Sequence, residues 1–304
     1  MKKNIFLISF IFLTINCIYS QVDSDYMLDK KQEYIIGNQY VFEFRDGTIA
    51  IGKYLKSAEG NIYIEDLKGE EIYIPKIMIA QVHNAKKSNV KGNEYWFPNL
   101  HDTRYFFSPT AFGLRQGEGY YHHGYWLLWQ FQYGLSDYFS IGGGTTLFGF
   151  PALFNGKFSI EIDSSSNFSL GWFWVGNLFW GDFEGDAIVN MPYGVFTYGN
   201  KETNFTIGTG YNLSTEISSE NRMVLNLGAI ARVERRFSLV FEAWMFNIFS
   251  NEPTFLGGPG IRYFRKVNRV TSRNGAGANT WDIQFLYNPE FERIIPVFGA
   301  SRKF

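Results

Sequence analysis

The chain has 304 residues and a formal net charge of -1, from 28 basic and 29 acidic residues. Basic residues are not in excess, and no basic cluster accompanies a nucleic-acid-recognition motif, which argues against a nucleic-acid-binding protein. Aromatic residues make up 19% of the sequence, beside 31 glycines and only 19% charged residues. This composition suits strands that present aromatic side chains to lipid, although an all-β protein in water also reaches these values.

The first twenty residues have the composition of an export signal. Lys2 and Lys3 precede a short apolar run, and the small residue Ser20 ends the segment. We predict a cleavable signal peptide over residues 1–20, because the apolar run is too short for a permanent membrane anchor. Cys17 is the only cysteine and lies inside this signal, so no internal disulfide is possible. Lipid attachment at Cys17 is the less favoured alternative.

A small β domain is predicted after a flexible mature N-terminus, residues 21–38. Two turn dipeptides, Asp46-Gly47 and Lys68-Gly69, separate short alternating runs, and Asp-Gly is a strong hairpin signal. Five strands within residues 39–85 resemble a small SH3-like or Sm-like domain in count and spacing. The predicted strands are 40–45, 49–55, 62–67, 72–74 and 79–82.

We expect residues 39–85 to lie in the periplasm. A docking or spacer role toward a protein partner is favoured there, with recognition of a peptide or glycan as the alternative. Residues 86–102 are expected to form a polar linker. The remainder of the chain, residues 103–304, is predicted to be an outer-membrane β-barrel.

The barrel prediction begins from a short aromatic phrase that returns four times. It contains Phe139, Phe168, Phe205 and Phe237, and its copies start 29, 37 and 32 residues apart. This interval suits one up-and-down strand pair with its connections, and an aromatic residue at the same place in each pair predicts an interfacial girdle. No later segment has 18 consecutive apolar residues, so an exported integral protein must be a closed barrel.

Twelve antiparallel strands are predicted, with ten as the alternative. Alternation is sharp after Phe205, where Phe205, Ile207 and Tyr211 share one face and Thr206 and Asn212 share the other. The expected strands are 103–114, 119–134, 138–148, 155–163, 167–179, 187–199, 203–214, 221–233, 236–249, 254–265, 279–287 and 293–304.

The turns and the last residue give the barrel an orientation. Connections before each repeated Phe are tight, as periplasmic turns usually are, and the alternate connections are longer, as extracellular loops are. The long basic connection 266–277 departs from this rule. Phe304 at the chain end is read as the signal for recognition by the barrel assembly machinery.

Three stretches carry a family likeness: 104–111, 117–121 and 133–142. They resemble uncharacterised outer-membrane β-barrel proteins of Bacteroidota, over roughly residues 95–304. The resemblance implies fold and location. It implies no catalytic residue.

No metal or catalytic site is predicted. His122 and His123 are adjacent, and neighbouring strand residues face opposite sides, so they do not converge on one metal ion. A lipid-cleaving barrel needs a His, a Ser and an orienting Asn or Asp on one face, and no spacing selects such a set. We therefore expect no catalytic residue, no metal ligand and no cofactor.

An inward charged row is the one candidate site. Glu242 is expected opposite Arg262, and Arg262 opposite Asp282, all with inward parity. An Arg at mid-depth facing lipid costs about 2–4 kcal/mol, which favours this inward placement. We predict a lumenal ion network that braces the wall, with a selectivity constriction as the alternative.

The sequence thus predicts a non-enzymatic outer-membrane barrel, a narrow channel or a structural protein, with a periplasmic docking domain. Two alternatives stay open: a lipid-modifying hydrolase barrel and a soluble secreted β-protein. The expected partners are outer-membrane lipid, the barrel assembly machinery and a periplasmic protein.

Overall fold

The computed structural model of the protein is all-β in the residues it describes, apart from one turn of 3-10 helix. The predicted signal peptide lies outside the described residues, and within them no helix has the length and apolar character to cross a membrane. Almost all of the described chain belongs to one compact unit, Gly37–Phe304. The described residues are 34–46, 48–85, 89–92, 94–125, 127–177, 187–214, 222–248, 253–266, 278–289 and 292–304.

The N-terminal strands form a five-stranded antiparallel sheet in the order β4-β3-β2-β1-β5. Its core contains Phe42 and Ile64, both fully buried. All five predicted strands are present, and β2 runs further than predicted. The elements are β1 (Gln39–Phe44), β2 (Ile49–Ala58), β3 (Asn61–Asp66), β4 (Glu71–Pro75), the 3-10 turn η1 (Lys76–Met78) and β5 (Ile79–Asn84). Two short strands, β6 (Val90–Lys91) and β7 (Glu94–Tyr95), follow and pair with each other.

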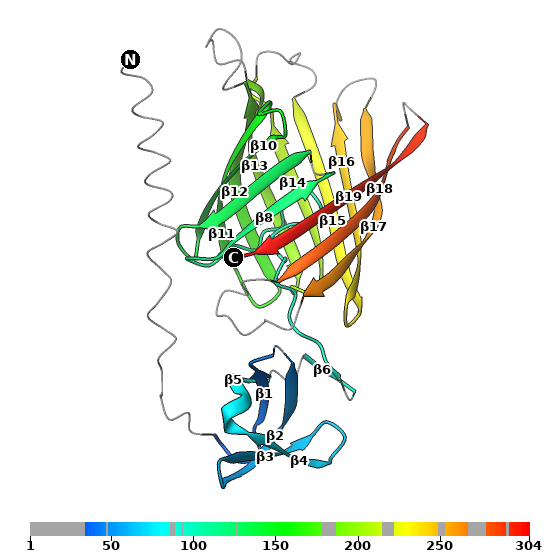
Figure 1. Ribbon diagram of the computed structural model, residues 1–304. Coiled ribbons are helices and arrows are strands. Elements are labelled where there is room, and N and C mark those ends of the chain that lie inside the picture. Colours follow the sequence, from blue (N-terminus) through cyan, green and yellow to red (C-terminus); the bar gives the residue numbers. More distant parts are fainter. Residues whose placement is uncertain are drawn as a thin grey trace, which may run out of the picture. The chain divides into compact units, whose positions relative to one another are not determined.

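The second part is a closed barrel of twelve antiparallel strands (Figure 1). It closes where β19 pairs with β8, and the backbone of Phe304 adds two hydrogen bonds with Gly119. The strands are β8 (Gly119–Gly124), β9 (Leu128–Gly134), β10 (Phe139–Thr146), β11 (Ala152–Glu161), β12 (Ser166–Gly176), β13 (Ala187–Gly199), β14 (Thr203–Tyr211), β15 (Met223–Glu234), β16 (Phe237–Phe246), β17 (Thr254–Lys266), β18 (Asn279–Asn288) and β19 (Arg293–Lys303).

The predicted number of strands is confirmed, but one predicted strand is absent and another is two strands in the structure. Residues 103–114 form no strand, only an isolated bridge between Arg104 and Pro109. The stretch 119–134, predicted as one strand, turns at Tyr125 and forms both β8 and β9. In residues 103–114, three aromatic residues stand in a row instead of alternating with polar ones. The segment lies inside the barrel and is not part of its wall, so all three rings pack against other residues.

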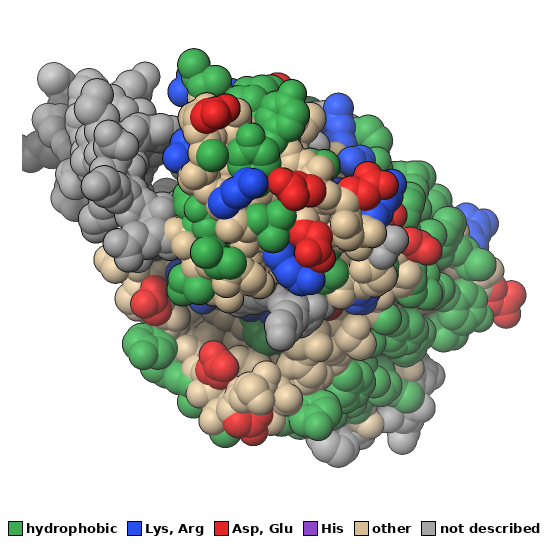
Figure 2. All heavy atoms as spheres, turned by 90° about the horizontal axis from the view of Figure 1, so that it is seen from below, with side chains coloured by type: hydrophobic (Ala, Val, Ile, Leu, Met, Phe, Trp, Pro, Cys, Tyr) green, Lys and Arg blue, Asp and Glu red, His purple; other side chains and the backbone are tan. Residues whose placement is uncertain are grey.

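Side chains alternate between the two faces of the wall as predicted. In β14, Phe205 is 49% exposed on the outside, whereas Thr206 beside it is fully buried inside. Figure 2 shows hydrophobic side chains gathered along the outer wall of the barrel. Phe139 and Phe237 are exposed on the outside, Phe168 is half-buried, and Phe304 is exposed at the chain end. The outer face is therefore apolar and the inner face largely polar.

Candidate functional site in the barrel lumen

Residues 97–114 run through the lumen, and we call this segment the plug. Most of its side chains are buried, with Tyr105 and Ser108 fully so. Its partners are inward-facing side chains of strands on all sides of the ring, from β11 to β19. An irregular segment inside a barrel has backbone groups that no ladder satisfies, so each needs a partner from the wall. The wall supplies these partners from charged and polar residues.

Glu242 of β16 binds the plug from one side. Its carboxylate accepts hydrogen bonds from the backbone N–H groups of Phe106 at 2.9 Å, Phe107 at 3.0 Å and Ser108 at 3.2 Å. The indole Nε1 of Trp244 donates to the same carboxylate at 2.8 Å. A single buried carboxylate thus satisfies a turn of consecutive backbone donors.

Arg262 of β17 donates hydrogen bonds to the plug, whereas Glu242 accepts them. Its guanidinium donates to the backbone carbonyls of His101 at 2.8 Å, Arg104 and Tyr105. It also pairs with Asp282 of β18, at 2.9 Å between Nε and Oδ1. Arg262 and Asp282 are both buried, so the pair is shielded from water.

Arg104, from the plug itself, joins the same pair. Its guanidinium lies 3.5 Å from the Asp282 carboxylate and donates to the hydroxyl of Ser301. It also donates to the carbonyls of Tyr105 and Phe106. Asp282 therefore pairs with two cations, Arg262 of the wall and Arg104 of the plug.

Lys157 of β11 binds the plug from another side of the barrel. Its ammonium donates to three plug carbonyls, those of Thr103 at 3.4 Å, Thr110 at 3.1 Å and Phe112 at 2.7 Å. These partners are neutral. Among the described residues no carboxylate lies within ion-pair distance of Lys157.

Two glycines of the wall make room for the plug's aromatic rings. A Cβ added at Gly228 of β15 would lie 2.1 Å from the Tyr105 ring, and one at Gly260 of β17 would lie 2.5 Å from the Phe106 ring. The Tyr105 hydroxyl then reaches Asn204 at 2.6 Å. Any larger residue at either glycine conflicts with the ring.

The predicted ion network is brought together only in part. The register of Arg262 opposite Asp282 agrees with the structure, and the two form the expected pair. Glu242, however, lies opposite Gly258, while Arg262 lies opposite Ser238, so the first predicted pairing was wrong. The β16–β17 connection is centred nearer residue 250 than the predicted 252, which shifts the partner by four residues.

Charged residues in the turns at one end of the barrel also contact the plug. Lys201, in the turn between β13 and β14, lies 2.5 Å from the buried Asp102 carboxylate. The Asp102 charge raises the pKa of Lys201 above its ordinary value. Next to it, Glu202 pairs with Arg232 at 2.9 Å and accepts from the Asn99 N–H at 2.6 Å.

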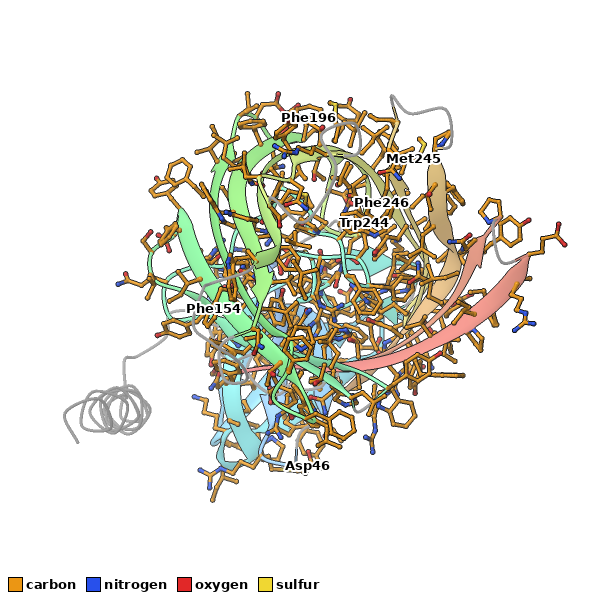
Figure 3. The ribbon with its side chains drawn as sticks, turned by 90° about the horizontal axis from the view of Figure 1, so that it is seen from above. Asp46, Phe154, Phe196, Trp244, Met245 and Phe246 are labelled. Carbon is orange, nitrogen blue, oxygen red and sulfur yellow. The ribbon has the colours of Figure 1, made fainter. Side chains whose placement is uncertain are left out.

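A cavity of about 730 Å³ lies inside the barrel next to the plug, which forms one end of it through Thr103, Arg104, Phe107 and Pro109. Its walls come from strands β8 to β18 and are mostly apolar. Seen from above, Trp244 and Phe246 point into the ring, whereas Phe154 and Phe196 point away from it (Figure 3). The lumen therefore has a filled part and a hollow part.

The histidine pair shows no metal-binding geometry. His122 is buried and its Nδ1 lies 3.0 Å from the Ser301 hydroxyl, while His123 packs on Trp129. In the described part of the chain, no three His, Cys, Asp or Glu side chains are placed to hold a metal ion. The Ser301 hydroxyl also accepts from Arg104, and neither it nor His122 lines the cavity. This Ser–His contact therefore does not face the cavity.

Sequence reasoning missed the plug, with Arg104 and Tyr105 in it, and its wall partner Lys157. For Lys157 the signal was present, because this cation has inward parity on a predicted strand. For the plug, the signal was the run of three aromatic residues 105–107, which does not alternate.

Neither a family model nor a curated protein matches the sequence. Among solved structures, a NanC porin structure has 8% identity and a TM-score of 0.40, covering 62% of this chain and 98% of that chain. OccK5 (OpdH) of Pseudomonas aeruginosa has 10% identity and a TM-score of 0.32, covering 86% and 73%. An anion-selective porin from Comamonas acidovorans has 12% identity and a TM-score of 0.31, covering 88% and 96%. Similarity this low supports no inference from those proteins, so the fold assignment rests on the chain's own strand pairing. The resemblance to barrels of Bacteroidota stays a prediction.

Proposed function

We propose that the chain is a non-enzymatic outer-membrane β-barrel protein whose lumen is closed by its own plug at the periplasmic end. The observation that carries the proposal is the inversion of the two faces of the wall. Apolar side chains such as Leu170, Ile207 and Trp281 are 43 to 54% exposed outside, while Ser169, Thr206 and Arg262 are buried inside.

Lipid gives this inversion its physical reason. A sheet in a bilayer must close on itself, because no water satisfies the backbone of an edge strand. Its outer face must then be apolar, and its polar residues must face the lumen. A soluble protein with the same outer face would expose an apolar surface much larger than monomers in water tolerate. A soluble secreted β-protein is therefore disfavoured.

The tight turns support the orientation. Connections 135–138, 162–165, 200–202 and 235–236 lie at the end where the plug contacts Lys201, Arg232 and Lys303. Short turns are typical of the periplasmic side. The five-stranded sheet precedes the plug in the chain, and the proposal assigns it to the periplasm, where its edge strands β4 and β5 are available for docking a partner.

The plug favours a structural or binding role over an open channel. Glu242, Arg262 and Asp282 act in this proposal as braces for the plug rather than as a selectivity constriction, because their donors and acceptors are occupied by plug backbone and by each other. The lipid-modifying hydrolase alternative has no support from the Ser301–His122 contact, because both residues are buried and neither lines the cavity.

Cell fractionation combined with gel mobility tests the membrane placement. We expect the full-length protein in the outer-membrane fraction, with a gel mobility in detergent that changes on heating. Recovery in the soluble periplasmic fraction, with the same mobility before and after heating, contradicts the proposal.

A further inference from the structure

We propose that the lumenal cavity is a binding site for an amphipathic anion, a molecule with one long apolar chain and a single carboxylate or phosphate group. The proposal goes beyond the membrane placement and the plug, neither of which requires a ligand. It rests on the chemistry of the cavity lining, on the local charge balance and on unpartnered polar atoms.

The walls of the cavity fit an apolar chain. Its volume of about 730 Å³ is in the range of ligand pockets, roughly 300–1,000 Å³. Aliphatic and aromatic side chains dominate the wall away from the plug. They include Phe173, Val189, Val224, Trp244, Phe246 and Leu256.

The end formed by the plug is cationic. Arg104 and Lys157 line it, and no carboxylate is among the described lining residues. Arg104 and Arg262 both lie within ion-pair distance of Asp282, whereas Lys157 has no carboxylate at that distance among the described residues. The buried charge of Lys157 is therefore balanced only by neutral carbonyl groups. A charge in a low-dielectric interior is costly without a counterion, and a bound anion supplies one.

Three polar atoms of the lining lack a hydrogen-bond partner among the described residues: Nε of Arg104 and the amide oxygens of Asn155 and Asn226. Buried polar atoms of folded proteins are nearly always paired, so unpaired ones in a cavity point to a ligand or to water. The Arg104 Nε–H is a donor for an anionic oxygen. The two amide oxygens are acceptors and are left to water beside the bound anion.

Together these features orient the ligand. The anionic group lies against Arg104 and Lys157 at the plug, and the apolar chain extends along Trp244 and Phe246 toward the far end of β16. The native group is a carboxylate or a phosphate, and the experiment below separates the two.

Quenching of tryptophan fluorescence tests the proposal on the full-length mature protein in lipid nanodiscs. Three sixteen-carbon probes with bromine in the chain are compared: a carboxylate, a phosphate monoester and a neutral alcohol. We expect saturable quenching by at least one anion, with an affinity at least about tenfold higher than for the alcohol. Whichever anion binds more tightly identifies the head group.

Matched variants locate the site. Trp244→Phe should remove the saturable quenching, while Trp281→Phe, which changes an outward-facing tryptophan, should leave it. Val189→Phe narrows the hollow part and should weaken binding. Lys157→Met should reduce the preference for an anion over the alcohol. If Lys157→Met does not fold, as shown by loss of the heat-dependent gel mobility, the site is tested by Trp244→Phe, Trp281→Phe and Val189→Phe instead.

Two results overturn the proposal: quenching that survives Trp244→Phe unchanged, or equal affinity for the anions and the alcohol. Either result leaves the membrane placement intact, because fractionation and gel mobility measure that placement without any ligand.

Discussion

The filled and hollow parts of the lumen differ in the chemistry of the wall that encloses them. Around the plug, the inner wall carries Lys157, Glu242, Arg262, Asp282 and Lys303, and all of them are buried. Around the cavity, the wall is mostly aliphatic and aromatic, with amides from asparagine and glutamine. Both parts belong to the same twelve strands.

This difference shows what the charged residues are for. Where irregular backbone crosses the lumen, each N–H and C=O needs a partner, and the wall places a carboxylate or a cation at that position. Where no backbone crosses, the wall has no such requirement. The charged residues therefore follow the path of the plug.

The largest expected effect comes from removing the acceptor of three plug N–H groups. Glu242→Ala leaves Phe106, Phe107 and Ser108 without their common partner. We expect a loss of about 3–5 kcal/mol in the free energy of unfolding, typical of breaking a buried charged interaction from one side. Urea unfolding in detergent measures it.

Glu161→Ala is the control for that variant, because Glu161 is an exposed carboxylate at the end of β11. Its effect should be within about 0.5 kcal/mol of zero. Similar losses in the two variants would show that Glu242 has no special role in holding the plug.

A smaller effect is expected where the plug's rings meet the wall. Gly228→Ala places a methyl group 2.1 Å from the Tyr105 ring and should cost about 1–3 kcal/mol through overpacking. Gly124→Ala is the control, since its nearest plug atoms, in Phe107, are 3.6 Å away. Adding Tyr105→Ala to Gly228→Ala should abolish the clash. Equal melting temperatures for the two alanine variants would contradict the packing.

At the rim, where water reaches the plug, the expected loss is smaller still. Lys201→Met leaves the buried Asp102 carboxylate without its partner at 2.5 Å, but Lys201 is itself half-exposed. We expect a loss of about 1 kcal/mol, at the lower end for an unsatisfied buried group. Asp102→Asn in the same chain should recover part of it, as measured by urea unfolding. No recovery would mean that the two residues do not interact.

The smallest effect is expected outside the barrel. Asp66 is the last residue of β3, and hydrogen bonds from the backbone N–H groups of Glu70 and Lys68 in the β3–β4 turn hold its pKa below its ordinary value. A depressed folded pKa gives stability that is present above the unfolded pKa and lost as the pH falls through the folded pKa. Asp66→Asn should therefore slightly lower the melting temperature at pH 7 and have no effect at acidic pH below the folded pKa. A pH-independent difference would contradict the hydrogen bonding.

Much of the wall was predictable from the sequence because it follows one local rule. Alternation after Phe205 predicted both faces of β14, and the Arg262–Asp282 register followed from counting outward from one turn. The error at Glu242 has the same origin, since a small shift of the turn centre moves the cross-strand partner by several residues.

The plug was not predictable by that rule. Residues 103–114 have the length and aromatic content of a strand, but in the structure Tyr105 and Phe106 pack into the space that Gly228 and Gly260 leave in the wall. Those glycines lie more than a hundred residues away in the sequence. A contact set by tertiary packing leaves no periodic pattern in the segment itself.

Conductance across a planar bilayer tests most directly whether the plug fills the lumen of a membrane-spanning barrel. The full-length protein should show no steady open pore, and a variant in which a short Gly/Ser linker replaces residues 97–114 should conduct, provided that its gel mobility still changes on heating. Steady conductance of the same size in both proteins would contradict the account.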